Sequence, residues 1–390
     1  MGVIPKGPDA RAKIYLTAGD HIDVFSADTN EFLAPIMPPS VSGLRQMKGL
    51  ALTPDNSQLL AANFADSSVA IIDPDNPSSS TAVRIPVSIV NSPGVADVVA
   101  TSAGKVFVDG VSATFSGCAG QLWELDLASL KVTQRTDTSG LQLSGNNFSR
   151  NTAGNLVSLA GDLCGTHLWS ASVDTFISGL AGGGDATSGD GYWFASDYTR
   201  LDAQLIQRMQ AQVPEFFSIL LFSPDLPGEK MNASGSLLYS PVAQGFATVE
   251  SNGIGITDTN LGTWLGQILL NEQIAHLAQS VMDFDEAGNR LFVITNKGLT
   301  VVDLPNPQLS IGYLSPATGS AAGGTTVTLR GSGFESGATV SFGGTTASAT
   351  FVDGSTLLAV TPGGAMGGVR VSVHNPDGTI YSLDAGFTYR

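Results

Sequence analysis

Short apolar runs separated by turn residues recur along the first 303 positions of the chain. Residues 50–86 contain one full unit, in which four short apolar segments are divided by clusters of Asp, Asn, Ser and Pro. Such runs are typical of strands buried between two neighbouring sheets, and the polar clusters supply the tight turns between them. The pattern therefore predicts β-strands in units of four.

The third segment of each unit ends in a small polar residue, which allows the copies to be aligned. It occurs at residues 21–26, 69–73, 122–126, 168–172, 254–258 and 299–303. Successive copies end 45 to 53 residues apart, except for one gap of 86. That gap spans two periods and predicts a hidden copy, with its third strand at residues 204–209. Seven units of this length predict a seven-bladed β-propeller over residues 1–305.

Some segments of the repeat leave alternatives open. Residues 201–213 and 270–278 also have apolar positions at helical spacing, so either could be a helical insertion. The chain enters the pattern at a second strand, residues 12–18, and the last unit lacks a fourth segment. Residues 3–9 could supply a missing strand, but their prolines would restrict it to a sheet edge.

One unit carries a more specific signature. Residues 47–90 contain an apolar segment at 50–52, Pro54-Asp55, Asn63-Phe64 and an apolar strand that ends at Asp73. This order resembles the YVTN family of β-propeller repeats. The other units match it less closely.

The composition changes at Pro307, after which Gly, Thr, Ser and Val dominate. Alternating segments with frequent turn signals over residues 306–390 predict a small immunoglobulin-like β-sandwich, so the fold class is all-β with two domains. The motifs follow in a specific order: Gly-Gly-Thr at 323–325, Gly-x-Gly-Phe at 331–334, Phe-Gly-Gly at 342–344, Asn-Pro-Asp-Gly at 375–378 and Phe-x-Tyr at 387–389. This order resembles the IPT/TIG family, which implies a spacer or docking module in surface receptors and secreted proteins.

The charge of the chain restricts its partners. The formal net charge is −16, and only 13% of residues are charged. An acidic propeller repels nucleic acids and anionic membranes, so no nucleic-acid partner is predicted. No apolar run is long enough to span a membrane, and no export signal is present in this chain. We predict an extracellular, periplasmic or cell-surface protein that binds a protein or a carbohydrate.

The sequence contains no local catalytic motif of the serine-hydrolase, zinc-protease or nucleotide-binding type. We therefore predict a non-enzymatic binding protein; the alternative is a propeller lactonase or lyase with its active site in the central channel. Candidate ligand-binding residues lie on the loops that enter the innermost strands: Arg45, Lys48, Asn91 and Asp97. No metal or cofactor is predicted, with a weakly held divalent cation as the alternative.

Two further patterns concern cysteine and calcium. Cys118 and Cys164 occupy equivalent positions in adjacent units, so a disulfide and a pair of buried thiols both remain open. Asp283 and Asp285 resemble the start of a calcium loop, but an EF-hand would need a glutamate where Ile294 stands. A turn is therefore predicted for that segment.

Overall fold

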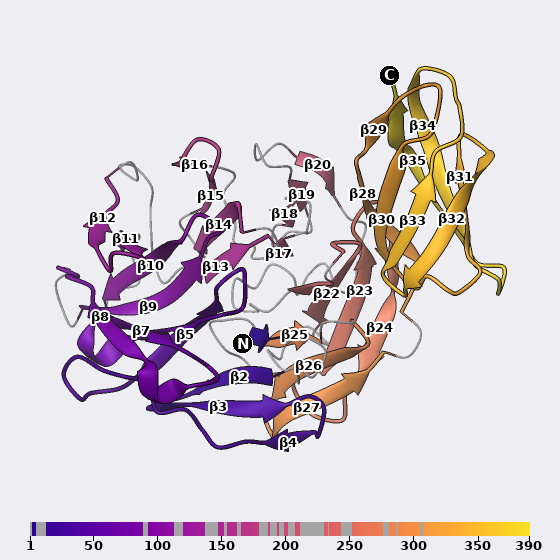
Figure 1. Cartoon of the computed structure of the whole chain (residues 1–390). Coiled ribbons are helices and arrows are strands. Elements are labelled where there is room, and N and C mark those ends of the chain that lie inside the picture. The colour runs from indigo at the N-terminus through magenta and orange to yellow at the C-terminus, as the bar shows by residue number, and fades with distance from the viewer. Residues whose placement is uncertain are drawn as a thin grey trace.

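The computed structural model describes residues 2–4, 13–88, 93–112, 120–136, 147–151, 154–161, 165–178, 186–187, 193–194, 199–201, 207–210, 230–232, 234–242, 252–275, 281–285, 288–304 and 307–390. These residues form an all-β molecule with two parts. Small sheets are arranged in a ring, and a sandwich of strands stands on one side of it (Figure 1). The N-terminus lies within the ring, and the C-terminus lies at the far end of the sandwich.

The first three sheets each have four strands joined in chain order. Blade 1 consists of β1 (Gly2–Ile4), β2 (Lys13–Ala18), β3 (His21–Ser26) and β4 (Glu31–Phe32). Blade 2 consists of β5 (Met47–Leu52), β6 (Leu59–Asn63), β7 (Ser68–Ile72) and β8 (Thr81–Arg84), with the short 3₁₀ turns η1 (Phe64–Asp66) and η2 (Pro77–Ser79). Blade 3 consists of β9 (Pro93–Ala100), β10 (Lys105–Ser112), β11 (Gln121–Asp126) and β12 (Val132–Gln134).

Three more four-stranded sheets follow, and the last sheet of the ring has three strands. Blade 4 consists of β13 (Asn147–Arg150), β14 (Leu156–Gly161), β15 (Gly165–Ser170) and β16 (Thr175–Ser178). Blade 5 consists of β17 (Ala186–Thr187), β18 (Trp193–Phe194), β19 (Thr199–Leu201) and β20 (Gln207–Gln210). Blade 6 consists of β21 (Lys230–Met231), β22 (Leu237–Val242), β23 (Gly253–Asp258) and β24 (Trp264–Leu269). The partial blade consists of β25 (Met282–Phe284), β26 (Arg290–Thr295) and β27 (Gly298–Asp303).

The predicted all-β propeller with a C-terminal sandwich is confirmed, but the predicted number of complete blades is wrong. Six sheets have four strands, rather than seven, because the last one stops at its third strand in the described part of the chain. The six aligned segments each coincide with the third strand of a sheet. The sequence predicts the third strand of blade 5 at residues 204–209. In the structure the third strand is β19, and residues 207–210 form the fourth strand, β20. Neither segment with helical spacing shows a helix at its described residues, which are 201, 207–210 and 270–275.

The blades hold together because their strands bury side chains on both faces. Every residue of β6 and β7 is buried. Val69 packs against Val98 and Val106 of blade 3, whereas Ala70 packs on the opposite side with Tyr15 of blade 1. Burial on both sides explains why the strands are continuous apolar runs rather than alternating ones.

The same type of turn recurs around the ring, directly after the innermost strand of a blade. It explains why a short polar residue follows that strand. In blades 2, 3, 4 and 6 and in the partial blade, the side chain of this residue accepts a hydrogen bond from a backbone N–H across the turn. The five residues are Thr53, Thr101, Asn151, Asn232 and Asp285. Only short polar side chains can close a turn in this way. The calcium-like segment is therefore the turn that the sequence predicts, with Asp285 accepting from the backbone N–H groups of Asn289 and Arg290 at 2.8 and 3.0 Å.

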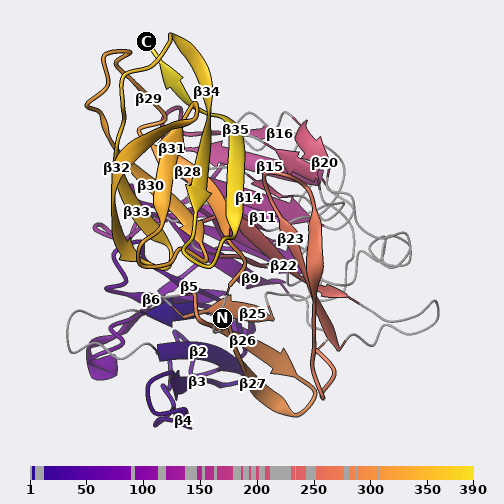
Figure 2. The same cartoon turned by 90° about the vertical axis from the view of Figure 1, so that its right-hand side faces the viewer.

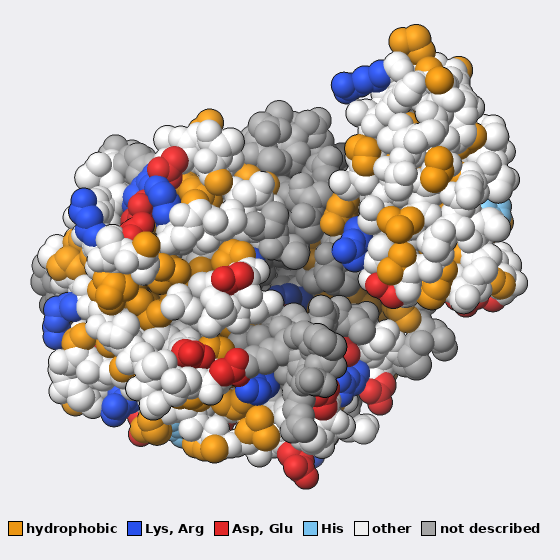
Figure 3. All heavy atoms as spheres, viewed as in Figure 1, with side chains coloured by type: hydrophobic (Ala, Val, Ile, Leu, Met, Phe, Trp, Pro, Cys, Tyr) orange, Lys and Arg blue, Asp and Glu red, His pale blue; other side chains and the backbone are white. Residues whose placement is uncertain are grey.

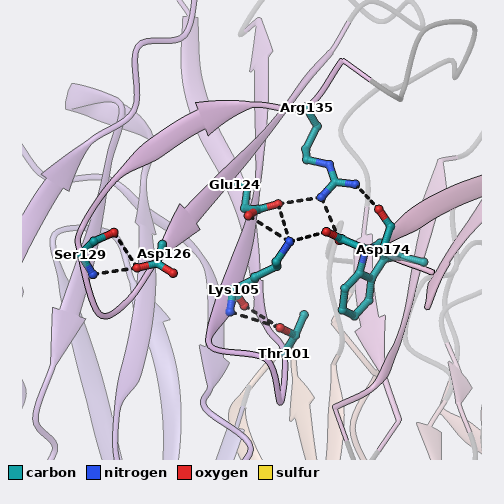
Figure 4. A network of polar contacts seen from close by, with 8 residues as sticks. Thr101, Lys105, Glu124, Asp126, Ser129, Arg135 and Asp174 are labelled. Atoms are coloured by element: carbon teal, nitrogen blue, oxygen red, sulfur yellow. Dashed lines mark hydrogen bonds and ion pairs between the residues drawn. The ribbon is translucent and has the colours of Figure 1, made fainter. Parts of the chain in front are cut away.

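A network of ion pairs joins the outer parts of blades 3 and 4 (Figure 4). Lys105 Nζ lies 3.2 Å from Glu124 and 2.6 Å from Asp174, and Arg135 Nη1 lies 2.7 and 3.1 Å from the same two carboxylates. The Arg135 guanidinium also lies over the Phe107 ring, 5.7 Å from its centroid. Two cations and two anions that share contacts form a network, which contributes more to stability than an isolated surface pair.

The stability of this network is expected to depend on pH through Asp174. Burial raises the pKa of this carboxyl, but hydrogen bonds from Lys105, Trp169 and Arg135 outweigh it and lower the pKa to about 2. A lowered pKa means that Asp174 stabilises the fold above its ordinary pKa, and that this stabilisation is lost as the pH falls toward 2. Asp174→Asn should therefore lower the urea midpoint at pH 7 and have little effect near pH 2. Asp28→Asn, in the exposed β3–β4 turn, is the control and should leave the urea midpoint at pH 7 unchanged. An effect of Asp174→Asn that stays constant from pH 7 to pH 2 would contradict this assignment.

The C-terminal sandwich is built from eight strands. They are β28 (Ser310–Ser315), β29 (Thr318–Gly319), β30 (Thr326–Ser332), β31 (Thr339–Phe342), β32 (Thr345–Asp353), β33 (Thr356–Val360), β34 (Gly367–His374) and β35 (Ile380–Tyr389). Their order is β28-β30-β33-β32-β31-β34-β35-β29, and the long β32 pairs with β33 at one end and β31 at the other. The core between the two layers contains Leu329, Phe342, Leu357 and Phe387, all with no more than 2% of their surface exposed.

Candidate functional site

The sandwich is docked onto blade 6 through a close backbone contact. Figure 2 shows the sandwich in front of the ring. β28 has an irregular register between Ile311 and Tyr313, with Gly312 at the break. A Cβ atom at position 312 would lie 2.0 Å from the carbonyl oxygen of Ser234, in the turn between β21 and β22. Glycine is therefore required at this point, because no side chain fits between the two backbones.

Two polar side chains complete the contact. Asn260 Nδ2 donates hydrogen bonds to the backbone oxygens of Ile311 and Gly312, at 2.6 and 3.1 Å. The Tyr381 hydroxyl donates to Asp258 Oδ1 at 3.1 Å, and Asp258 is only 1% exposed. The same carboxylate oxygen accepts the backbone N–H groups of Asn260 and Leu261, so it orders the β23–β24 turn and holds the sandwich at once.

A cavity of about 750 Å³ lies between the two domains. The propeller contributes the turns after the innermost strands of blade 6 and of the partial blade, including Asn232 and Asn289, together with Tyr239 of β22. The linker and sandwich contribute residues 307–309, 331–335, 354–355 and several residues of the β34–β35 turn. Ligand sites occur preferentially at such domain junctions.

Asn375 shapes the wall of this cavity on the sandwich side. Its Nδ2 donates to the Gly333 carbonyl at 2.7 Å, and its Oδ1 accepts from the Glu335 backbone N–H at 3.2 Å. Gly333 has a φ of +67°, and a Cβ there would lie 2.4 Å from the Pro307 carbonyl oxygen. The Gly-x-Gly-Phe and Asn-Pro-Asp-Gly motifs, 40 residues apart in the sequence, therefore meet at the cavity and define its shape.

The described residues of the lining are mostly polar, and none of them is a lysine or an arginine. Hydroxyl and amide groups predominate, the carboxyl groups of Glu335 and Asp377 are the charged members, and the rings of Tyr239 and Phe334 are included. Burial raises the pKa of the Tyr239 hydroxyl to about 12, so it stays a neutral hydrogen-bonding group. Among the residues that the structure describes, no cluster of three His, Cys, Asp or Glu side chains could hold a metal ion.

The predicted channel residues have separate local partners. Arg45 Nε donates to the Pro38 carbonyl at 2.7 Å, and exposed Lys48 has its Nζ 6.0 Å from the centroid of the Phe64 ring. Asp97 is buried at the junction of three blades: a Cβ at Gly49 of blade 2 would meet its side chain, and its Oδ2 accepts the Phe148 N–H of blade 4 at 2.8 Å. Asp97 thus has a structural role, and ligand binding by these three residues remains a prediction.

Other predicted positions lie outside the described residues, namely Asn91, Cys118 and Cys164. The loop that carries Arg45 joins β4 to β5, so it leaves the ring at the strand ends opposite to the β21–β22 and β23–β24 turns. The interdomain cavity and the predicted channel loops therefore lie on opposite faces of the propeller. Sequence reasoning missed the residues that join the domains, because a glycine in a β-bulge and a turn asparagine have no distinctive spacing.

Comparisons with known proteins agree with the fold. Residues 309–389 match the IPT/TIG domain family. No curated protein matches the chain in sequence. In the described part of the chain, no helix has the length and apolarity that crossing a bilayer would need.

Solved structures with a similar fold are distant in sequence. Kuenenia stuttgartiensis hydrazine synthase has a TM-score of 0.52 and 12% identity, with 77% of this chain and 94% of that chain covered. The β-propeller domain of Myceliophteria thermophila Cps50 (Swd1) has a TM-score of 0.51 and 10% identity, with 77% and 96% covered. The Dos1 propeller has a TM-score of 0.50 and 12% identity, with 75% and 74% covered. At this identity the likeness to these structures concerns the fold alone. The chain thus forms a propeller-like ring, and its residues 309–389 match the IPT/TIG domain family.

Proposed function

We propose that this chain is a non-enzymatic binding protein of the cell surface or cell exterior, and that the two domains bind its ligand jointly. The observation that supports this is the polar cavity lined by both domains, next to the close approach of Gly312 to Ser234. The YVTN type of the repeat, a domain boundary at residues 305–306 and an exported location belong to the same proposal. A lactonase or lyase activity in the central channel is the alternative, and no described cluster of side chains favours it.

The lining of the cavity indicates the class of ligand. Glu335 and Asp377 oppose an anion, and the described residues of the lining include no lysine or arginine to attract one. Hydroxyl and amide groups can both donate to and accept from the hydroxyls of a sugar, and carboxylates can accept from them. We therefore propose a neutral carbohydrate.

The test is binding to immobilised neutral and acidic oligosaccharides, followed by calorimetry on the tightest neutral sugar. Thr379, an exposed residue of the lining, can be replaced by tryptophan to fill the cavity. Thr379→Trp should weaken binding at least tenfold. Thr345→Trp, at an exposed threonine of the same domain outside the lining, should leave the affinity unchanged.

Two results would contradict the proposal. Preferential binding of acidic sugars would show that the charge argument fails. Binding of a neutral sugar with equal affinity by wild type and Thr379→Trp would place the site elsewhere, for example at the loops that carry Arg45 and Lys48.

A further inference from the structure

The last sheet of the ring ends at its third strand in the described part of the chain, whereas each of the other sheets has a fourth strand beside its third. In blades 1 to 6 the third strand pairs with a fourth strand on its outer side. β27 is the third strand of the partial blade, and in the described part of the chain its outer edge has no strand beside it. The backbone groups along such an edge can pair with another extended segment.

The burial of β27 reflects this difference. β7, a third strand inside a complete blade, is buried at all five residues, and β23 is buried at all but Ile256. No residue of β27 is buried, although it carries Leu299, Val301 and Val302. The apolar sequence of β27 therefore suits a central strand, whereas its position is that of an edge.

The neighbouring blades form walls on both sides of this edge. Leu299 and Val301 pack against the blade 1 cluster that contains Ile14 and Phe25, and Val302 packs on the other side in the cluster of blade 6. A segment placed next to β27 would therefore enter a slot between two existing sheets.

Phe32 lies at the blade 1 wall of this slot and is 57% exposed. It is the strand partner of Phe25, so both rings are on the same face of blade 1. Phe25 packs edge-to-face on Phe292 of β26, with ring centroids 6.2 Å apart, whereas Phe32 reaches farther out, to the radius of a fourth strand. Figure 3 shows hydrophobic side chains along this lower rim of the ring, over β3 and β4. A fourth strand in the partial blade would cover the Phe32 ring.

The charges around the slot indicate the chemistry of the segment. Exposed Asp28 and Glu31 lie on the blade 1 side, and exposed Asp303 ends β27. These three carboxylates face two cations: Lys297 in the turn before β27, and Arg290, which is hydrogen-bonded to Ala27 and Asn30. The whole chain carries a net charge of −16. A segment flanked by lysine or arginine is therefore favoured over an acidic one.

We propose that the outer edge of β27 binds an extended, basic-flanked strand from a partner protein, which completes the partial blade. The partner strand pairs antiparallel with β27 through backbone hydrogen bonds and places apolar side chains at alternate positions against Phe32. This interaction surface is different from the interdomain cavity, which is lined by residues of blade 6, the partial blade and the sandwich.

The test uses the full chain and a fluorescent peptide, Lys-Val-Thr-Val-Thr-Val-Lys, with fluorescence anisotropy as the readout. Saturable binding is expected, and Phe32→Ala should weaken it at least fivefold. The matched control is Val173→Ala, since Val173 is 64% exposed near the outer strand of the complete blade 4. This control should bind like wild type, as should Asp174→Asn. A peptide with two central prolines should not bind, and one flanked by glutamate should bind at least fivefold more weakly.

Hydrogen exchange shows whether the bound peptide is at β27. In the free protein the β27 amides should exchange faster than those of β7, and the peptide should slow them at least tenfold. β27 amides as protected as those of β7 in the free protein would overturn the proposal, because the chain itself would then fill the slot. Self-association that protects β27 would also overturn it, since a second copy of the chain would be the occupant. Equal binding of the proline peptide would show that no strand pairing occurs.

Discussion

Gly312→Ala is expected to release the C-terminal sandwich from the propeller while both domains stay folded. The added Cβ would lie 2.0 Å from the Ser234 carbonyl oxygen, and a backbone atom cannot move aside as a flexible side chain can. Separation removes the Asn260 hydrogen bonds to β28 and the buried bond from Tyr381 to Asp258. At about 1 kcal/mol for each neutral bond and about 2 kcal/mol for the bond to a carboxylate, docking should weaken by about 3 to 5 kcal/mol.

Small-angle scattering and limited proteolysis measure this release. The radius of gyration should rise, and the linker around residues 305–308 should be cut faster than in wild type. The sandwich should keep its own unfolding transition, since the core around Phe342 and Phe387 is built from residues of the sandwich alone. Neutral-sugar binding in the cavity should be lost at the same time.

Gly368→Ala is the matched control for this experiment. Gly368 lies in β34 of the same domain, and a Cβ there would have its nearest neighbour, the Ala385 Cβ, at an ordinary 3.4 Å. Its scattering profile and cleavage rate should equal those of wild type. If Gly312→Ala behaved in the same way, the domain contact described here would be wrong.

Phe292→Ala is expected to open the ring at its closure. Phe292 is fully buried between the partial blade and blade 1, where it packs on Phe25. The Arg290 guanidinium lies 5.6 Å from its ring centroid and donates a hydrogen bond to the Ala27 carbonyl of blade 1. In the described residues no strand is shared across this junction, because β1 is the innermost strand of blade 1 and the partial blade ends at β27. Side-chain packing must therefore carry the closure.

Replacing a buried phenylalanine by alanine lowers the free energy of unfolding by about 3 to 5 kcal/mol, because apolar burial is lost and a cavity is left behind. In hydrogen exchange, the loss of protection should be largest in β2, β3, β26 and β27, on the two sides of the junction. Phe342→Ala removes an equally buried ring from the sandwich core and should weaken the sandwich transition alone. If Phe292→Ala lost protection equally in all blades, the ring would open as one cooperative unit. That result would contradict an opening confined to the junction of the partial blade and blade 1.

Much of the fold could be predicted because its signals are local. Each third strand needs apolar residues on both faces and a turn after it, and both requirements appear within a few residues, as in β7 and β11. The polar residue that closes each recurrent turn, such as Thr53 or Asn232, acts within five residues of its own position. The predicted position of the third strand of blade 5 is wrong because β17, β18 and β19 have only two or three residues each. Such strands are too short to show a periodic pattern in the sequence.

The cavity between the domains could not be predicted from the sequence in the way that the fold could. The sequence points to loops that enter the innermost strands, since propellers bind ligands there, and ligand binding at those loops stays a prediction. Of those residues, Asp97 packs against Gly49 and accepts the Phe148 N–H. The cavity that the structure shows lies on the other face of the ring, between domains that the sequence presents as separate. Several residues of its wall belong to the Gly-x-Gly-Phe and Asn-Pro-Asp-Gly motifs, but a motif does not indicate that its residues enclose a cavity.

The sequence by itself determined the all-β class, the four-stranded period and the immunoglobulin-like end of the chain. These follow from the burial needs of each strand and the chemistry of each turn, which act between near neighbours. Only the tertiary structure decided how the domains dock, where the cavity lies and which strand edge is left uncovered. Gly312 meets the Ser234 carbonyl and Tyr381 meets Asp258 across many residues of chain, and a backbone contact leaves no side-chain pattern to read. The edge of β27, uncovered in the described part of the chain, likewise follows from how the strands are arranged in space and not from a local pattern.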